Sequence, residues 1–238
     1  MSTYVLIHGS WQGGWCWKKI IPFLENKGHK VVAPDLPGHG SYKTPVQDIS
    51  LQAYVDEVCE ILDAQSEPVI LVGHSLGGVV ISQAAEYRPD KIRKLVYLSA
   101  FLLKNGECLM QYAEQDTDAL ALPNLIMADD QLSATFNEDA LKDAFYGDCS
   151  DEDVLWAKSL LTPQAAAPFM TPIHTTEENF GRIPRVYISC LRDRGVSLAL
   201  QEKMYTHVPC EKVIKMDTSH SPNISTPEDL AENLLSLA

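Results

Sequence analysis

Short apolar runs alternate with longer amphipathic segments over most of the chain. Runs of strand length occupy Tyr4–Ile7, Lys30–Ala33, Val69–Val72, Leu95–Ala100, Arg185–Cys190 and Lys212–Met216. Segments with helical spacing of apolar residues occupy Trp17–Asn26, Leu51–Ala64, Gly77–Tyr87, Leu198–Thr206 and the stretch from Thr226 to the end. Continuously apolar strands that alternate with helices are typical of a parallel sheet covered on both faces. The pattern therefore predicts an α/β fold with a doubly wound, mainly parallel sheet.

The rhythm changes between residues 102 and 182. Segments Asp129–Tyr146 and Asp151–Leu161 have helical periodicity, and no run typical of a buried strand is evident. We interpret residues 102–182 as a helical cap inserted over the carboxyl edge of the sheet, where ligands bind in open α/β sheets. Residues 1–101 and 183–238 are then the α/β core.

The strongest chemical signal is the motif Gly73-His74-Ser75-Leu76-Gly77, which lies between a predicted strand and a predicted helix. A sharp turn in this context lifts the serine hydroxyl above the sheet and makes it a nucleophile. The alternative is a tight turn with an incidental serine. The amide of Leu76, at the start of the helix, can point at a developing oxyanion.

A serine nucleophile needs a base and an orienting acid, which follow it in the order acid, then histidine. His220 lies in the loop after the last predicted strand and is the expected base; a surface histidine is the alternative. Asp193 follows the preceding strand and is the expected acid, with Asp217 as the competitor. Arg192 and Arg194 flank Asp193 and are expected to hold it ionised.

The second oxyanion donor is expected from the glycine-rich loop after the first strand. Within His8–Trp15 the amide of Ser10 is the candidate, together with that of Leu76. The loop matches neither of the glycine patterns that cradle nucleotides. No cofactor and no metal is therefore expected.

Several motifs together resemble the α/β-hydrolase superfamily: His8-Gly9-Ser10, Gly13-Gly14-Trp15, Pro37-Gly38-His39-Gly40 and Gly73–Gly78. The short cap and the segment Ser219–Pro222 are similar to small bacterial carboxylesterases and to the plant methylesterase and hydroxynitrile lyase group. The resemblance implies Ser75 as nucleophile, Asp193 as acid and His220 as base, with Ser10 and Leu76 supplying the oxyanion amides.

Two departures from the lyases of this group bear on the reaction. They carry a lysine directly after the catalytic histidine, where this chain has Ser221, and a threonine at the position of Ser10. The resemblance thus favours a serine carboxylesterase that hydrolyses small, neutral esters through an acyl-enzyme. A hydroxynitrile lyase and a ligand-binding receptor with vestigial turnover are the alternatives.

Apolar residues near the predicted site are expected to line a substrate pocket. The candidates are Trp11, His74, Phe101, Leu102, Met127 and Trp156, with Phe136, Phe145, Phe169 and Met170 as further cap residues. For each cap aromatic, simple packing onto the sheet is the alternative.

The chain has 238 residues and a net charge of −13. Residues 102–182 hold 15 acids and 4 bases, so most of this charge belongs to the cap. Such a balance argues against a nucleic acid or an anionic membrane as partner. A solvated acidic cap is one reading of the charge; the other is that its field repels anionic esters and favours neutral or cationic ones.

The cellular setting is inferred from what the chain does not contain. Its six cysteines are scattered, it opens without a recognisable signal peptide, and no apolar run approaches the length of a membrane span. We therefore expect a cytoplasmic protein with reduced thiols. The oligomeric state stays open, with a homodimer among the alternatives.

Overall fold

A six-stranded parallel sheet forms the centre of the protein. The computed structural model describes residues 1–238. The strands lie in the order β2-β1-β3-β4-β8-β9, and every neighbouring pair is parallel. Their bounds are β1 Thr3–Ile7, β2 Lys30–Val32, β3 Val69–His74, β4 Ile92–Leu98, β8 Arg185–Cys190 and β9 Lys212–Met216. The predicted α/β fold with a mainly parallel sheet is confirmed.

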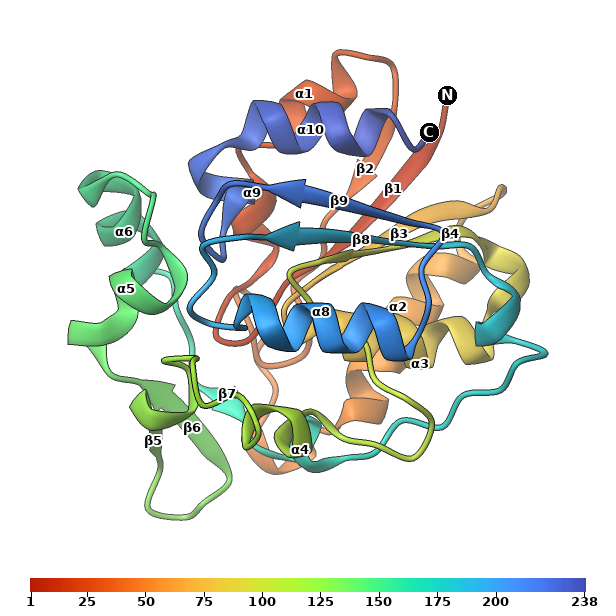
Figure 1. Ribbon diagram of the computed structural model, residues 1–238. Coiled ribbons are helices and arrows are strands. Elements are labelled where there is room, and N and C mark those ends of the chain that lie inside the picture. The colour runs from red at the N-terminus through yellow and green to blue at the C-terminus, as the bar shows by residue number, and fades with distance from the viewer.

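Helices cover both faces of this sheet (Figure 1). One face carries α1 Ile21–Glu25 and α10 Pro227–Leu235, and the other carries α2 Leu51–Asp63, α3 Gly77–Tyr87 and α8 Leu198–His207. The short helix α9 Pro222–Ser225 precedes α10. Short 3-10 turns complete the set: η1 Gly14–Trp17, η2 Val46–Asp48, η3 Pro89–Lys91, η4 Leu122–Asn124, η5 Glu138–Ala140 and η6 Phe180–Arg182.

Alternate residues of the central strands pack into two separate apolar cores, one on each face of the sheet. In β1, Val5 and Ile7 join the larger core cluster, whereas Tyr4 and Leu6 join the smaller one. Successive side chains of a strand point to opposite faces, so a strand buried on both sides must be apolar at every position. The uninterrupted apolar runs of the sequence follow from this requirement.

The predicted helix over Trp17–Asn26 is wrong in its first half. The chain forms the 3-10 turn η1 Gly14–Trp17 and only then the short helix α1 Ile21–Glu25. Pro22 lies in the first turn of α1, where its missing N–H costs no hydrogen bond. Proline is tolerated there and disfavoured in a helix interior, so the helix begins beside it.

The cap, residues 102–182, contributes no strand to the main sheet. It contains a second, antiparallel sheet of β5 Leu125–Met127, β6 Ser133–Phe136 and β7 Gln164–Ala165. Its helices are α4 Leu109–Ala113, α5 Leu141–Phe145, α6 Asp151–Lys158 and α7 Ala167–Met170. The cap is therefore mixed rather than purely helical.

The expectation of a helix across 129–146 is wrong up to Phe136. Strand β6 pairs there with β5 on one side and β7 on the other. Ala134 and Phe136 are buried while Thr135 between them is exposed, which is the alternation of a strand. The alternating stretch is only four residues long, too short to be recognised beside the stronger helical pattern of α5.

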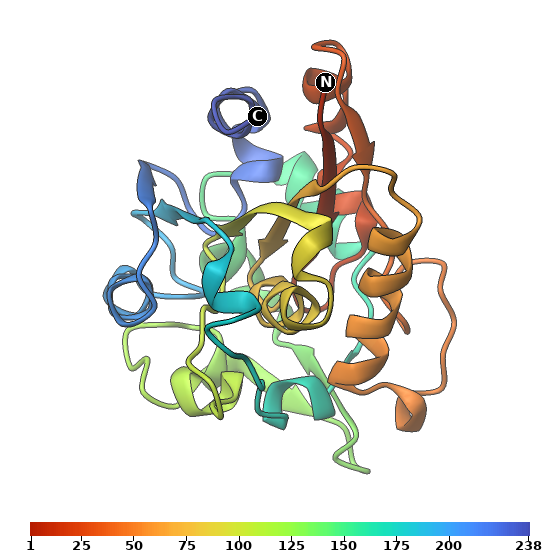
Figure 2. The same ribbon diagram turned by 90° about the vertical axis from the view of Figure 1, so that its right-hand side faces the viewer.

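The cap lies at the end of the sheet to which β8 and β9 point, so it faces the carboxyl ends of the parallel strands (Figure 1). The two chain termini lie near each other on the opposite side of the molecule in both views (Figures 1 and 2). No helix combines the length and apolar character that crossing a bilayer requires.

Candidate active site

Ser75 occupies the turn between β3 and α3 with a left-handed backbone, φ 54°. Its amide donates to the carbonyl of Leu98 at 3.3 Å, and its carbonyl accepts from the amides of Gly78 and Phe101 at 3.1 Å each. Three hydrogen bonds thus hold a conformation that a residue with a side chain rarely adopts. The turn leaves Ser75 at the carboxyl edge of the sheet, facing the cap.

Glycines let three pieces of backbone approach this turn. A Cβ on Gly9 would lie 2.8 Å from the Cβ of Ser75, and one on Gly73 would lie 2.6 Å from the carbonyl oxygen of Gly77. A Cβ on Gly77 would meet the carbonyl oxygen of Ile7 at 2.8 Å. The flanking glycines of the motif are therefore required by close backbone approach.

His220 and Asp193 form a buried pair beside this turn. The Nδ1–H of His220 donates to Oδ2 of Asp193 at 2.7 Å, and both side chains are almost fully enclosed. Oδ1 of Asp193 accepts from the amides of Gly195 and Val196 at 2.7 and 2.9 Å. Nε2 of His220 makes no hydrogen bond to the protein, so it is the ring nitrogen available to a reactant.

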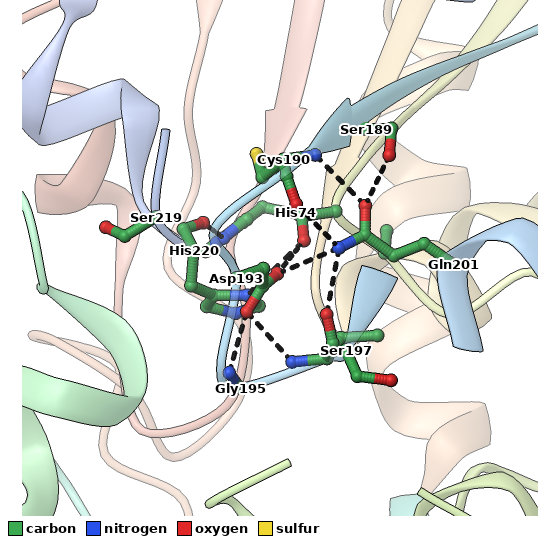
Figure 3. Close-up of polar contacts among 12 residues, drawn as sticks. His74, Ser189, Cys190, Asp193, Gly195, Ser197, Gln201, Ser219 and His220 are labelled. Atoms are coloured by element: carbon green, nitrogen blue, oxygen red, sulfur yellow. Dashed lines mark hydrogen bonds and ion pairs between the residues drawn. The ribbon is translucent and has the colours of Figure 1, made fainter. Parts of the chain in front are cut away.

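Two further side chains bind Asp193. The hydroxyl of Ser99, which follows β4, donates to Oδ2 and lies 3.4 Å from Nδ1 of His220. Figure 3 shows Asp193 between His220 and Gln201, whose amide nitrogen lies 3.4 Å from Oδ2. The Gln201 amide is also hydrogen-bonded to the backbone of Cys190 and Val196, so it connects β8 to the loop that carries Asp193.

The expected role of the two arginines is wrong. Arg192 pairs with Asp217 at 2.9 Å and with Asp148 at 3.6 Å, and it forms no ion pair with Asp193. Arg194 is exposed and forms no ion pair. Backbone amides and Ser99 surround Asp193 instead, because a loop that turns back on its own carboxylate presents its N–H groups first. The competing acid, Asp217, is largely exposed and belongs to the Arg192 pair.

The loop after β1 and the start of α3 each contain an amide without a protein partner. Neither the N–H of Ser10 nor that of Leu76 donates a hydrogen bond to a protein acceptor. The loop is held from below by His8, whose Nδ1–H donates to the carbonyl of Gly9 at 2.8 Å and whose Nε2 accepts from Leu36 at 3.0 Å. Burial lowers the pKa of His8 to about 4, so the ring is neutral and can keep both roles.

His74 is hydrogen-bonded to the backbone of His220. Its Nε2–H donates to the carbonyl of His220 at 2.9 Å, and burial together with the neighbouring His220 lowers its pKa far below the usual value. Nδ1 of a neutral ring with this tautomer is an acceptor, and it faces the Gln12 amide at 3.2 Å. The structure places the Gln12 oxygen on this side and has its nitrogen donate to the Tyr146 hydroxyl at 3.1 Å. The tautomer of His74 requires the amide to be turned over, so that its nitrogen donates to Nδ1 and its oxygen accepts from Tyr146.

An apolar cavity opens over Ser75. Apart from Ser10, Ser75, Asp116 and Gly195, its walls are hydrophobic: Trp11, Phe101, Leu109, Met110, Ala113, Ala119, Ala121, Leu122, Leu125, Phe145, Phe169 and Val196. A smaller adjoining cavity is lined by Gly9, His74, Ser75 and His220, among others. The structure thus brings together Ser75, His220 and the Ser10 loop around one space.

Of the predicted pocket residues, Trp11 and Phe101 line the main cavity and His74 the adjoining one. The other three lie elsewhere, and their prediction is wrong. Leu102 is fully buried in the core, Met127 belongs to strand β5, and Trp156 packs edge-on against Trp15 with ring centroids 5.2 Å apart. Leu102 and Trp156 contribute to the larger apolar core, whereas Met127 is half-buried outside both cavities.

The further cap residues named from the sequence lie in different places in the structure. Phe145 and Phe169 line the cavity, whereas Phe136 packs on Trp11 with centroids 5.5 Å apart and Met170 is exposed. Asp116 was not predicted, since an acid in an acidic segment carries no local signal. Ser99 was also missed, although its place directly after a central strand was a usable indication. No group of three or more His, Cys, Asp or Glu converges as metal ligands would.

Comparison with known proteins places the chain in a family. The profile of the Alpha/beta hydrolase family matches residues 4–233, and the chain belongs to this family. It is 34% identical to a pyrethroid hydrolase of Sphingobium wenxiniae over all of this chain and 88% of that protein. It is also 34% identical to salicylic acid-binding protein 2 of Nicotiana tabacum, over 99% of this chain and 96% of that one.

Methylesterases are similar as well. Methylesterase 9 of Arabidopsis thaliana is 32% identical over all of this chain and 98% of its own length. The chain spans only 64% and 56% of two putative chloroplastic methylesterases of the same plant, to which it is 33% and 32% identical. Among solved structures, polyneuridine aldehyde esterase superposes with a TM-score of 0.88 at 26% identity, covering 100% of this chain and 99% of the other.

Proposed function

We propose that this protein is a serine carboxylic-ester hydrolase with Ser75 as its nucleophile. One observation carries the proposal. Ser75 shares a cavity with His220, whose Nε2 has no protein partner, and with the loop that presents the unbonded amide of Ser10. A nucleophile, a base with a free nitrogen and two oxyanion donors are the parts that acyl transfer needs.

The reaction proceeds in two halves. Nε2 of His220 takes the Ser75 proton as the hydroxyl oxygen attacks the ester carbonyl, and the oxyanion accepts from the amides of Ser10 and Leu76. His220 then donates that proton to the departing alcohol, leaving an acyl group on Ser75. A water molecule, deprotonated by His220, attacks the acyl carbon. The bond to Ser75 then breaks, His220 returns the proton to the Ser75 oxygen, and the acid is released. Asp193 stabilises the imidazolium in both halves through its bond to Nδ1.

Ser99 is the competing serine, since it is hydrogen-bonded to Asp193 and lies near His220. It is completely buried and lines neither cavity, so an ester carbonyl does not reach its hydroxyl. It also lies on the Nδ1 side of His220, the side that Asp193 occupies. We therefore assign Ser99 to positioning Asp193.

Hydrolysis is favoured over cyanohydrin cleavage. None of the residues that line the two cavities is a lysine or arginine, so no fixed cation faces the space where a cyanide leaving group would form. Ser221, which replaces the lysine of the lyases, is fully buried and lines neither cavity. The methylesterases and the pyrethroid hydrolase among the relatives support small carboxylic esters as the substrate class.

Ester hydrolysis by the wild type and by Ser75→Ala tests the proposal. With p-nitrophenyl acetate and butyrate, the substitution is expected to lower kcat by roughly 10⁴–10⁶-fold, the usual effect of removing a serine nucleophile. Ser66→Ala, at an exposed serine, serves as the matched control and is expected to keep the wild-type rate. Equal rates for wild type and Ser75→Ala would end the proposal.

A covalent label identifies the nucleophile directly. A fluorophosphonate reacts with an activated serine, and mass spectrometry of the digested protein locates the adduct. We expect the adduct on the peptide that contains Ser75 and none on the peptide that contains Ser99. The reverse location would transfer the role of nucleophile to Ser99.

A further inference from the structure

Asp116 is the only charged side chain among the residues that line the cavity over Ser75. It lies in the loop after α4 and is only 9% exposed. The surrounding wall is apolar, and the other two polar side chains, those of Ser10 and Ser75, belong to the reaction centre. The carboxylate is thus a polar group of the pocket that the reaction itself does not use.

Only one of the two oxygens of the Asp116 carboxylate has a hydrogen-bond partner in the protein. Oδ2 accepts from the amide of Ser197 at 2.9 Å. No lysine, arginine or histidine forms an ion pair with Asp116, and Oδ1 accepts no hydrogen bond, although it is not sealed off by protein atoms. An ionised group without a partner in an apolar environment is costly, so such groups are ordinarily paired.

We propose that Asp116 binds a positively charged nitrogen group of the substrate, so that the preferred substrates are cationic esters. This inference rests on the proposed hydrolase function and narrows its substrate class. A cation at Oδ1 would supply the missing partner in the same cavity in which Ser75 attacks the ester. The apolar wall would contact the hydrocarbon between the two groups.

The charge of the cap acts in the same direction. Its 15 acids and 4 bases attract cations toward the cavity and repel anions. A role of Asp116 in folding alone would be met by Oδ2, because the bond to Ser197 needs a single acceptor and no charge. The unpaired Oδ1 is the part that such a role leaves unexplained.

Matched ester pairs test the inference. One member carries a trimethylammonium group and the other the isosteric tert-butyl group, separated from the ester by two to six methylene groups, in one series on the alcohol side and in another on the acyl side. For the wild type we expect kcat/KM to favour the cationic member by about tenfold or more at the best length, as for a paired charge. The quaternary group keeps its charge at every pH.

Two asparagine variants distinguish the effect of Asp116 from the effect of the cap's overall negative charge. Asp116→Asn keeps the size of the side chain and an acceptor for Ser197 but removes the charge, and it is expected to lower the cationic-to-neutral ratio about tenfold. Asp118→Asn removes an exposed charge two residues away and is expected to keep the ratio. If both variants lowered the ratio equally, the cap's field and not Asp116 would be the cause. Asp116→Ser, which also keeps an acceptor oxygen, replaces Asp116→Asn if the latter does not fold.

Binding to an inactive protein distinguishes this inference from the proposed reaction. In Ser75→Ala, calorimetry with the intact esters is expected to give a Kd about tenfold lower for the cationic member, and the additional Asp116→Asn change is expected to abolish the difference. Preferential binding without turnover in the wild type would refute the hydrolase and keep the Asp116 site. Hydrolysis with equal kcat/KM and equal Kd for both members would overturn the Asp116 site alone.

Discussion

Ser99 donates its hydroxyl to Oδ2 of Asp193, the same oxygen that accepts from His220. The two residues follow neighbouring parallel strands, β4 and β8, which end at the same edge of the sheet. Asp193 is therefore held by the fold on one side and by its own loop on the other, and its orientation toward His220 does not depend on a surface ion pair. A carboxylate fixed in this way keeps the imidazole in one tautomer and one position.

Removing the Ser99 hydroxyl is expected to slow the reaction without changing its nucleophile. A hydrogen bond to a charged group contributes about 1.5–3 kcal/mol, so Ser99→Ala should lower kcat roughly 10–100-fold with little change in KM. Steady-state kinetics measure kcat and KM separately, and fluorophosphonate labelling should still modify Ser75. Ser99→Thr, which restores a hydroxyl, is expected to recover part of the rate. A loss of labelling in Ser99→Ala would contradict a positioning role.

Asp148 connects the cap to the loop that carries His220. Its carboxylate accepts from the amide of Ser219 at 2.8 Å and from the Ser219 hydroxyl, next to His220 in the chain. Asp148→Ala is expected to release this loop and lower kcat about tenfold, with a loss of roughly 1–3 kcal/mol in stability. Kinetics and urea unfolding measure the two effects. Asp217→Ala, at an exposed acid of the same loop, should leave kcat within twofold; an equal loss there would refute the specific role.

Gly9 is expected not to tolerate a side chain because it lies so close to Ser75. A methyl group there would lie 2.8 Å from the Cβ of Ser75, so either the Ser10 loop or the nucleophile turn must move. A shift of the oxyanion amide costs roughly 10²–10³-fold in kcat, the effect of losing one such donor. Gly147→Ala is the matched control, since its nearest contact would be an ordinary 3.5 Å. Kinetics of Gly9→Ala close to wild type would show that the loop can yield.

Acid is expected to destabilise the protein through its buried histidines. Burial lowers the pKa of His8 to about 4 and that of His39, which also lies beside His8, to about 3, from 6.5 for a free side chain. Below pH 6.5 these two imidazoles therefore bind protons in the unfolded chain but stay neutral in the folded one. The stability contributed by these two histidines is fully present above pH 6.5. It falls with decreasing pH until the folded pKa values are reached, by roughly 1.4 kcal/mol per pH unit for each histidine.

Urea unfolding between pH 7 and 4.5 measures this slope. Replacing His39 with glutamine removes one titrating group and should make the slope shallower by about one proton. His207→Gln, at an exposed histidine, should leave the slope unchanged. Asp35 adds a loss of the same sign at lower pH: burial opposes its ionisation, but hydrogen bonds from Ser41 and Gly14 outweigh this and lower its pKa below 3.8. A stability that does not change from pH 7 to 4.5 would contradict neutral, buried histidines.

The sequence was most informative where a residue's role depends on its immediate neighbours. The motif around Ser75 contains its own strand, turn and helix signals, and the glycines on either side are demanded by contacts that any such turn makes. Asp193 and His220 could be proposed because each directly follows a strand, and strand ends meet at one edge. The distant partners of Asp193 could not be proposed: Ser99 and Gln201 are brought to Asp193 by the ends of β4 and α8. The amides of Gly195 and Val196 belong to the loop of Asp193 itself, but only the folded path of that loop turns them toward its carboxylate.

By itself the sequence determined the parallel sheet, the turn at Ser75 and the location of the negative charge, since apolar runs, glycines and acids act locally or simply add. Only the tertiary structure decided which cap residues face the cavity, because a side chain's direction in a short, irregular element depends on what the element packs against. It turned Trp156 and Leu102 away and placed Asp116 inside. The charge of a segment can thus be counted from the sequence, whereas one buried carboxylate near a nucleophile is a result of folding.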